Sequence, residues 1–565
     1  MRSSLLLAAA PLILLAGCAT ATSPAASAQA QDPPIASTYG KFLAGEAALN
    51  EGRSAEAAHY FDEARIETAD KGLVAERAFT SALLAGDIDR AAALAPTGDE
   101  ASEPAKRLGR LTQAVRAIAD DKGKEAEALL ANESIGFPHR PAAALLAPWA
   151  AAEAGDVDAS LVRPQVRGDR VVDYFGQLGQ ALLYERARRY DEAETDFKAA
   201  LAAGARGEMA SLAYGGFLER RGRRADALAV YDAALAQDPD SVAMKAARER
   251  AAAGHAAPPA PSIKQGAAQA LLAPTAVMIS AKQSQVALAY LRMILKLDPD
   301  RDEAQVMVGD LMAAAGDQPA ARAAYSQPKP GSPEYAAAQS KLAWTYQGDG
   351  DKETALKLAR QAAASGELEG RMTLADLLRA DEKYQESAQV LSGLIAQQKT
   401  PDWRLLYARG VDYEQIGRWP DAEADLKAAL AAQPDEPELL NYLGYSWIDR
   451  NEHLKEAMGM VERAVASDPR SGAMVDSLGW AYYRLGDYKQ AVQKLEAAVE
   501  LDAGDAEINN HLGDAYWKVG RKDEALFQWR RVLSLQPDAK IKADAETKIA
   551  SMQGPDGPTQ KLAEH

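Results

Sequence analysis

Residues 437–537 repeat one sequence pattern three times in succession. The units read PELLNYLGYSWIDRNEHLKEAMGMVERAVASDPR, GAMVDSLGWAYYRLGDYKQAVQKLEAAVELDAGD and AEINNHLGDAYWKVGRKDEALFQWRRVLSLQPDA. Stacking them aligns Gly444, Gly479 and Gly513, at steps of 35 and 34 residues. A period near 34 is typical of helix–turn–helix repeats. One hairpin cannot bury its own apolar face, so the pattern predicts an all-α solenoid stabilised by stacked neighbours.

Small residues in each unit predict close contact between its two helices. In the middle unit Leu478 and Tyr482 lie four residues apart, on one face of the first helix. Gly479 lies between them and leaves room for the second helix. Ala491 and Ala498 leave the same room on the second helix. The sequence therefore predicts tightly packed helical hairpins.

The composition agrees with such a fold and excludes some functions. Hydrophobic residues make up 47% of the 565 residues, but aromatic residues only 6%, which suits closely packed helices. The formal net charge of −17 argues against non-specific nucleic-acid binding, which needs a basic surface. A single cysteine excludes an internal disulfide.

The first 17 residues, MRSSLLLAAAPLILLAG, have the short basic start and apolar run of a signal peptide. The run ends in LAGC and resembles the bacterial lipobox, which implies cleavage before Cys18 and acylation of that residue. Two acyl chains suffice for stable anchoring. Ala19 follows, and the resemblance to bacterial sorting rules favours the outer membrane, with the protein on its periplasmic face. The alternative is an ordinary signal peptide with a chance cysteine.

The rest of the chain is expected to form two repeat arrays. The motif GHAAPPAP at residues 254–261 is biased to extended structure and favours a boundary, although a loop within one superhelix is the alternative. The expected segments are a flexible tether over 18–37, an array of degenerate repeats over 38–253, a linker over 254–267, a second array over 268–537, a capping helix over 538–552 and a disordered tail over 553–565.

No catalytic, cofactor or metal motif appears in the sequence. None of the six histidines pairs with another at metal-ligand spacing, and no H-E-x-x-H, C-x-x-C pair, Walker loop or G-x-S-x-G is present. We therefore expect a protein that is not an enzyme and binds no cofactor or metal. A cell-wall enzyme with scattered catalytic residues is the alternative from another class, but no carboxylate pair can be nominated for it.

The segments WRLLYARG, LNYLGYSW, VDSLGWAYYRLGDY and NNHLGDAYWKVGR within residues 403–537 resemble the tetratricopeptide-repeat (TPR) outer-membrane lipoproteins of Gram-negative bacteria. The resemblance implies a right-handed superhelix that binds periplasmic or envelope proteins. Some members are adaptors that present substrates to a periplasmic C-terminal-processing protease. It therefore implies a non-enzymatic scaffold for envelope maintenance, with no nucleic-acid partner and with room for homo-oligomers. An assembly factor for an export or secretion machine is the alternative.

The resemblance also implies a binding groove on the first helices. Unit positions 2, 5, 9 and 12 line the concave face in tetratricopeptide proteins, and this spacing puts them on one face of a helix. The candidate groove residues are Tyr407, Glu414, Asn441, Tyr445, Asp476, Trp480, Tyr483, Asn510, Asp514 and Trp517.

Two interpretations of these groove positions remain open. Aromatic and amide side chains can anchor a bound peptide. In the other interpretation, Trp480 and Trp517 fill the space between adjacent hairpins while Asn and Asp satisfy helix ends. Carboxylate-clamp members of the family carry lysine and arginine here. Asp and Asn in their place favour a neutral or basic partner segment.

Overall fold

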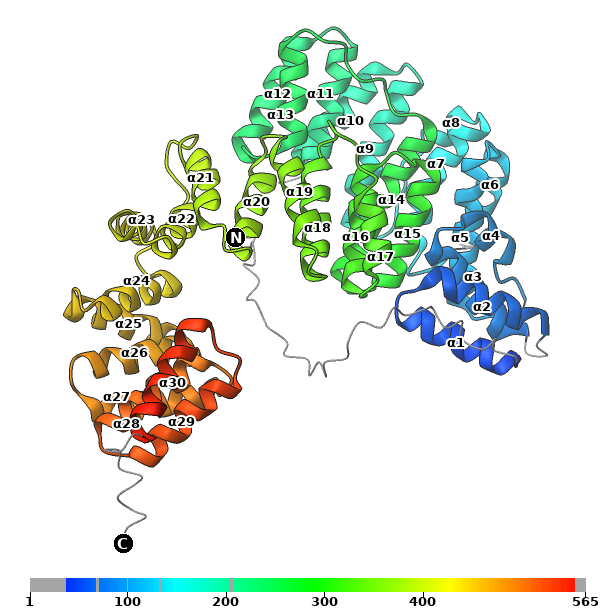
Figure 1. The fold of residues 1–565 in the computed structure, drawn as a ribbon. Helices are drawn as coiled ribbons and strands as arrows, with labels where there is room; N and C mark the ends of the chain where they lie inside the picture. The colour runs from blue at the N-terminus through cyan, green and yellow to red at the C-terminus, as the bar shows by residue number, and fades with distance from the viewer. Residues whose placement is uncertain (1–36, 68–70, 99, 132–134, 204–206, 554–565) are drawn as a thin grey trace. The chain divides into compact units, whose positions relative to one another are not determined.

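The computed structural model describes most of the chain in α-helices (Figure 1). The described residues are 37–67, 71–98, 100–131, 135–203 and 207–553. They contain 30 α-helices and no β-strand, so the all-α prediction is confirmed. No helix in these ranges is both long and apolar enough to cross a membrane. The signal peptide, Cys18, the tether as far as residue 36 and the tail from residue 554 lie outside the described residues.

The chain divides into two compact units, residues 1–109 and 110–565. The first unit holds α1 (Thr38–Asn50), α2 (Ser54–Glu67), α3 (Lys71–Ala85) and α4 (Ile88–Leu94). Each of these helices packs on the next. Gly45 lets α1 approach α2, because a Cβ there would lie 2.9 Å from the Phe61 ring. This is the close glycine contact that the repeat pattern predicts.

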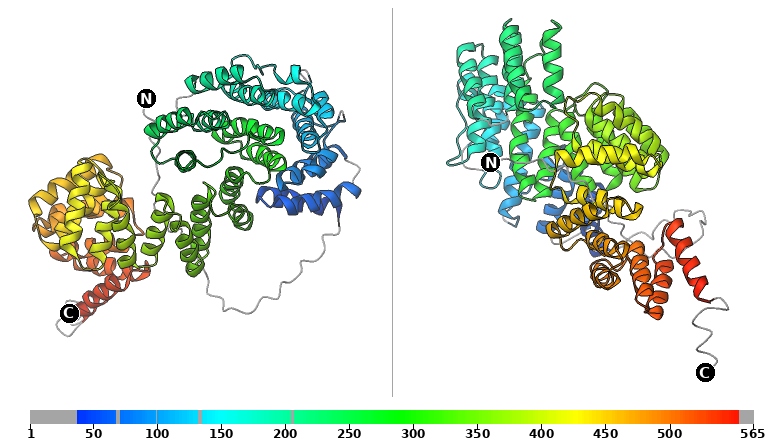
Figure 2. Two further views of the ribbon diagram at one scale, coloured as in Figure 1. Left: turned by 90° about the horizontal axis from the view of Figure 1, so that it is seen from above. Right: turned by 90° about the vertical axis from the view of Figure 1, so that its left-hand side faces the viewer.

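The second unit begins with helices that follow the repeat pattern poorly in sequence. They are α5 (Glu103–Ala119, which crosses the division), α6 (Gly123–Leu130), α7 (Arg140–Ala154) and α8 (Val157–Ser160). The following helices are α9 (Arg170–Arg186), α10 (Tyr190–Ala203), α11 (Glu208–Arg220), α12 (Arg224–Gln237) and α13 (Val242–Ala252). In Figure 2, helices that follow one another in the chain lie side by side in pairs.

The segment after α13 is shorter than the predicted linker. Residues 255–262 are not helical, but Ser262 and Gln265 form a capping box that starts α14 (Ile263–Ser280). Residues 263–267, expected in the linker, are therefore helical. The segment is also held in place, because Arg220 donates a hydrogen bond to the Pro258 carbonyl at 3.1 Å. The division into two arrays at this segment stays a prediction.

Helix α14 packs back onto α7 and α9, across the intervening helices α10–α13. Gly266 faces the buried Trp149 indole so closely that a Cβ there would overlap the ring. At the N-terminal end of α7, His139 Nδ1 lies 2.7 Å from the Tyr290 hydroxyl, 151 residues further along the chain. The His139–Tyr290 contact joins residues on both sides of the predicted linker, and the Gly266–Trp149 contact joins the end of that linker to the first predicted array.

The remaining helices pair as hairpins in chain order. Those up to residue 432 are α15 (Ser284–Leu297), α16 (Asp302–Ala314), α17 (Gln318–Tyr325), α18 (Tyr335–Gly348), α19 (Lys352–Ala363), α20 (Leu368–Ala380), α21 (Tyr384–Ile395), α22 (Trp403–Gln415) and α23 (Trp419–Ala432). The last seven are α24 (Pro437–Arg450), α25 (Leu454–Ser467), α26 (Gly472–Arg484), α27 (Tyr488–Leu501), α28 (Ala506–Lys518), α29 (Lys522–Ser534) and α30 (Ala539–Gln553).

The hairpin of α26 and α27 shows how sequence sets the local structure. A Cβ on Gly479 would lie 2.6 Å from Leu495 Cγ, so glycine permits the close approach of the two helices. Gly486 makes the turn with a φ of 86°, a conformation that side chains disfavour. Asp487 then caps α27 by accepting a hydrogen bond from the Gln490 backbone N–H.

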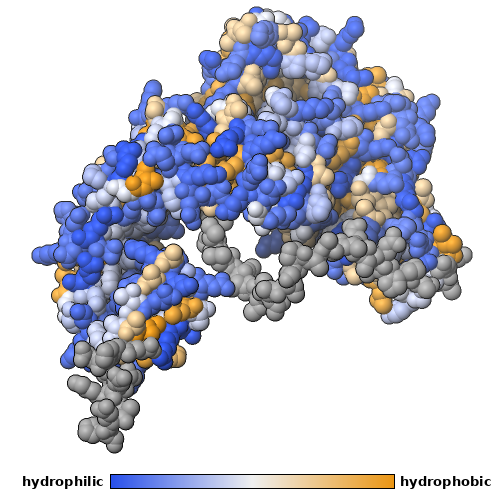
Figure 3. All heavy atoms as spheres, in the orientation of Figure 1, coloured by the Kyte–Doolittle hydropathy of each residue, from blue (hydrophilic) through white to orange (hydrophobic). Residues whose placement is uncertain are grey.

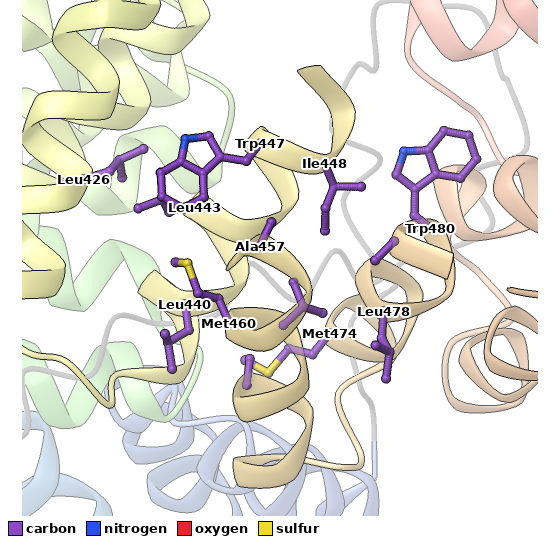
Figure 4. Close-up of a cluster of buried hydrophobic side chains, with 13 residues drawn as sticks. Leu426, Leu440, Leu443, Trp447, Ile448, Ala457, Met460, Met474, Leu478 and Trp480 are labelled. Atoms are coloured by element: carbon purple, nitrogen blue, oxygen red, sulfur yellow. The ribbon is translucent and has the colours of Figure 1, made fainter. Parts of the chain in front are cut away.

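A buried cluster continues from α23 through α26 and joins successive hairpins (Figure 4). Trp447 lies beside Leu426 and Leu443, while Trp480 lies at the other end of the cluster. Val461 also belongs to it and faces Gly444. The core is thus continuous from hairpin to hairpin, as a solenoid requires.

Candidate functional site

The candidate groove residues lie on four first helices, α22, α24, α26 and α28. Helix α24 packs on α26, α26 on α28, and α28 on α30. The helices therefore form a row, and their facing side chains form the surface that we call the inner face. It is made by the ten candidate groove residues together with Glu438, Ala473 and Glu507.

The first helix of the row places Tyr407 and Glu414. The Tyr407 ring meets Tyr442 of α24 edge-on, with ring centres 5.5 Å apart. Burial, together with the Glu438 carboxylate, raises the pKa of Tyr407 to about 12. Glu414 accepts hydrogen bonds from Ser446 and from Arg450, so its charge is balanced within the array.

Helix α24 contributes Asn441 and Tyr445, which differ in their contacts. The Tyr445 hydroxyl donates a hydrogen bond of 2.6 Å to Glu507 of α28, two units further on. Burial and the charge of Glu507 raise the pKa of Tyr445. Asn441 is partly buried, and its Oδ1 has no hydrogen-bond partner. The inner face is therefore narrow enough for side chains of α24 and α28 to touch.

Helix α26 contributes Asp476, Trp480 and Tyr483 to an aromatic and ionic stack. The Trp480 ring stacks on Tyr483 at 4.5 Å and on His511 at 4.0 Å between ring centres. Trp480 is only 8% exposed, and Asp476 is also buried. Both oxygens of Asp476 lie within 3.1 Å of His511 Nδ1. Trp480 thus packs between two hairpins.

Helix α28 contributes Asn510, Asp514 and Trp517, and α30 covers the first two. Lys548 donates to Asn510 at 3.2 Å and to Asp514 at 2.8 Å. Asp514 also accepts from the Trp529 indole at 3.1 Å. Burial raises the pKa of Asp514 despite the opposing charge of Lys548.

The structure brings the ten candidates to one face but leaves none of them fully exposed. Asp476, Trp480 and Asn510 are buried, and the other seven are partly buried. More open positions of the inner face are Glu438, Ala473 and Glu507. Binding of a partner by any of the ten stays a prediction.

Sequence reasoning missed three contributors to this face: His511, Asp544 and Lys548. His511 follows Asp476 by 35 residues, close to one repeat. The repeat period could therefore have predicted that the two residues lie near each other on neighbouring first helices. Asp544 and Lys548 lie on α30, whose sequence lacks the repeat pattern that positioned the others.

The described ranges contain no group of three or more His, Cys, Asp or Glu residues arranged to hold a metal ion. A cavity of about 20 Å³ lies between α7, α9 and α14, lined in part by Trp149, Phe175 and Gly266. That volume has room for about one water molecule.

Models of the tetratricopeptide repeat match four stretches of the chain. One "tetratricopeptide repeat" model matches residues 178–242 and 407–472, and another matches residues 506–539. A "TPR repeat" model matches residues 479–520. The chain therefore carries tetratricopeptide repeats, and three of these stretches cover α22–α29. Proteins built of such repeats are generally non-enzymatic interaction scaffolds.

A curated relative and several solved structures are similar to parts of the chain. TPR repeat-containing protein PA4667 of Pseudomonas aeruginosa is 36% identical over 90 residues, which are 16% of this chain and 15% of the relative. A tetratricopeptide repeat protein from Parabacteroides merdae is 15% identical, with a TM-score of 0.38, over 43% of this chain and 96% of its own. The Cut9–Hcn1 hetero-tetramer chain is 14% identical, with a TM-score of 0.38, over 90% of this chain and 95% of its own.

Proposed function

We propose that this protein is a non-enzymatic scaffold that binds a basic or neutral protein segment along the inner face. The observation that carries the proposal is the unbalanced charge of this face. Glu438 and Glu507 are exposed carboxylates there, and among the described residues no cation pairs with either. The partly buried rings of Tyr445 and Tyr483 belong to the same face. Complementary charge steers and selects a partner.

The inner face differs in composition from an ordinary hydrophilic protein surface. Figure 3 shows a largely hydrophilic surface with scattered hydrophobic spots on the side in view. Scattered apolar residues are normal on soluble surfaces and need no partner. A row of four helices with acidic and aromatic side chains is more specific, because such a row can contact an extended segment over several units.

We further propose that acyl chains on Cys18 anchor the scaffold in the outer membrane, facing the periplasm. The lipobox-like LAGC sequence and the single cysteine support this. An anchored scaffold raises the local concentration of its partners. On this proposal it supports envelope maintenance by holding envelope proteins near one another, including substrates presented to a periplasmic protease.

Site-specific photo-cross-linking tests the inner face. A photoreactive residue replaces Ala473, which is exposed on α26 and has a small side chain. The control replaces Phe527, which is 62% exposed on the second helix α29. Incubation with envelope extract should give a cross-linked protein from position 473 and none from position 527.

Charge reversal then tests the chemistry of the partner. Adding Glu438→Lys to the Ala473 cross-linker should strongly reduce the yield, and higher salt should also reduce it, because exposed charges are screened. Circular dichroism should stay helical, since Glu438 is exposed. Equal yields at positions 473 and 527, or a yield unaffected by Glu438→Lys, would overturn the proposal.

Membrane fractionation tests the anchor. Cys18→Ser removes the only thiol of the chain, so the protein should either stay uncleaved or be released from membranes. Processing and fractionation identical to the unchanged protein would contradict lipid anchoring and leave the inner-face proposal unaffected.

A further inference from the structure

His511 lies at the centre of the inner face and joins α28 to α26. It is 6% exposed, and its Nδ1 lies 3.0 Å from Asp476 Oδ2 and 3.1 Å from Asp476 Oδ1. Its ring stacks on Trp480 at 4.0 Å with an angle of 12° between the planes. A histidine is the side chain that most readily changes charge near neutral pH. Its proton therefore sits between two neighbouring repeat units.

Carboxylates outnumber cations around His511. Asp476 faces it from α26, and Glu507 and Asp514 act on it from α28 itself. Asp544 of α30 also interacts electrostatically with His511. Lys548 of α30 forms ion pairs with Asp514 and Asp544. Protonated His511 and Lys548 are thus the two cations beside four carboxylates in this cluster.

Arg484 of α26 lies 6.0 Å from the centre of the Trp480 ring and pairs with Asp449, and other helices near α28 add polar groups. From α24, the Tyr445 ring lies 6.3 Å from the His511 ring, and its hydroxyl is bonded to Glu507. From α29, the Trp529 indole N–H donates to Asp514. On α27, Glu496 is bonded to Tyr516 and to Arg521.

These surroundings favour the charged form of His511. Burial lowers the pKa of His511, but the charge of Asp476, its hydrogen bond and the charges of Glu507 and Asp514 outweigh that effect. The pKa is therefore raised above its ordinary value. In its charged form the imidazolium pairs with the buried Asp476 carboxylate and joins α26 to α28.

We propose that the proton on His511 controls access to the inner face: the face is closed while His511 and Asp476 form an ion pair, and it opens when the proton is lost. This inference rests on the proposed function, because it describes regulation of the same surface. Loss of the proton leaves Asp476 as a buried charge without its cation, which is costly. Separation of α26 from α28 lets water reach that carboxylate.

The sign of the pH dependence follows from the raised pKa. A group whose pKa is higher in the folded state stabilises that state fully below its unfolded pKa, which is about 6.5 for histidine. The stabilisation is lost as pH rises through the folded-state pKa. The closed face is therefore expected below the folded-state pKa of His511, and the open face above it.

Opening would expose hydrogen-bonding groups that the closed face leaves unused. The Trp480 Nε1 donor and the Asn441 Oδ1 acceptor are buried, and neither has a hydrogen-bond partner. They lie on adjacent helices, α26 and α24. One donor and one acceptor of this kind match the carbonyl and N–H groups of an extended peptide, so opening prepares the surface for a bound segment.

Thiol labelling at Asn441 tests the inference without any partner. In the full chain carrying Cys18→Ser, Asn441→Cys is the reporter and Phe527→Cys is the exposed control. A maleimide labels both, and the ratio of their rates cancels the ordinary effect of pH on thiols. The ratio should rise several-fold between about pH 6 and about pH 9, while the chain stays helical.

Two variants decide whether His511 is responsible. His511→Gln cannot be protonated, so its labelling ratio should be high at both pH values. If that variant loses helicity, Asp476→Asn replaces it and should make the ratio independent of pH, because neither the ion pair nor a buried unpaired carboxylate can then form. A ratio independent of pH in the parent chain, or a rise unchanged in these variants, would overturn the inference. Labelling reports opening alone, so its failure leaves the cross-linking test of partner binding intact.

Discussion

The two ends of the second unit use helical hairpins in different ways. In α22–α30 each helix packs on the next, and α24, α26, α28 and α30 also pack on one another in order, so contacts stay local in sequence. Around α7, by contrast, α14 packs against helices that precede α10–α13. There the Lys264 ammonium donates to the Ala119 carbonyl, 145 residues earlier. The first arrangement adds one hairpin to the next, whereas the second brings together helices that lie far apart in the sequence.

This difference predicts how many helices a destabilising substitution affects. In a stacked array, stability is approximately a sum of units and neighbouring interfaces, so a defect affects its own hairpin and those beside it. A contact that closes a long loop has no local substitute, so its loss should affect all the helices that it joins. Substituting glycine by alanine at one site in each region makes this a direct comparison.

The largest effect is expected from Gly266→Ala. The new Cβ would overlap the ring of Trp149, which is 3% exposed and cannot move without opening the core. We expect a loss of about 3 kcal/mol of stability, at the upper end for overpacked cores. Helix α14 should separate from α7, and limited proteolysis should cut residues 255–262 faster. Unchanged cleavage would show that the α7–α14 contact is not needed to hold this segment.

A smaller and local effect is expected from Gly479→Ala. The Cβ would lie 2.6 Å from Leu495 Cγ, but a leucine side chain can rotate, and alanine favours the helix by about 1 kcal/mol. We expect a net loss of about 1 kcal/mol. Hydrogen exchange should accelerate in α26, α27 and their immediate neighbours. Acceleration that also reached α14 would contradict local stacking.

The smallest effect serves as the control for both substitutions. Gly459 of α25 has open space around its Cα, so Gly459→Ala adds no contact. Helix propensity alone then predicts a gain of up to about 1 kcal/mol. Thermal unfolding followed by circular dichroism measures it. Destabilisation here would mean that changes at the other two glycines cannot be assigned to their contacts.

The same contrast explains what could be predicted from the sequence. Hairpins of α22–α29 follow from local signals, such as Gly479 opposite Leu495 and the cap at Asp487, which need only residues of one unit. The contact between Trp149 and Gly266 leaves no such signal, because Trp149 lies in the first predicted array and Gly266 in the predicted linker. The sequence contains the capping-box residues Ser262 and Gln265, but the prolines before them predicted a linker instead of the start of a helix.

The inner face was predicted in position but not in exposure. Helical periodicity predicts Asn441, Tyr445, Asp476 and Trp480 on facing sides of neighbouring helices, and in the structure these residues lie on α24 and α26, which pack together. How closely successive first helices approach depends on packing between units. That distance lets Tyr445 reach Glu507 and buries Trp480, so exposure could not be read from one unit alone.

On the proposed function, a partner binds along the first helices α22, α24, α26 and α28. The decisive experiment is hydrogen exchange of the full chain, with and without the protein cross-linked through position 473. Binding along the inner face should slow exchange in these four helices and change it little in the second helices α23, α25 and α27. Protection confined to the second helices, or to helices before α22, would contradict it.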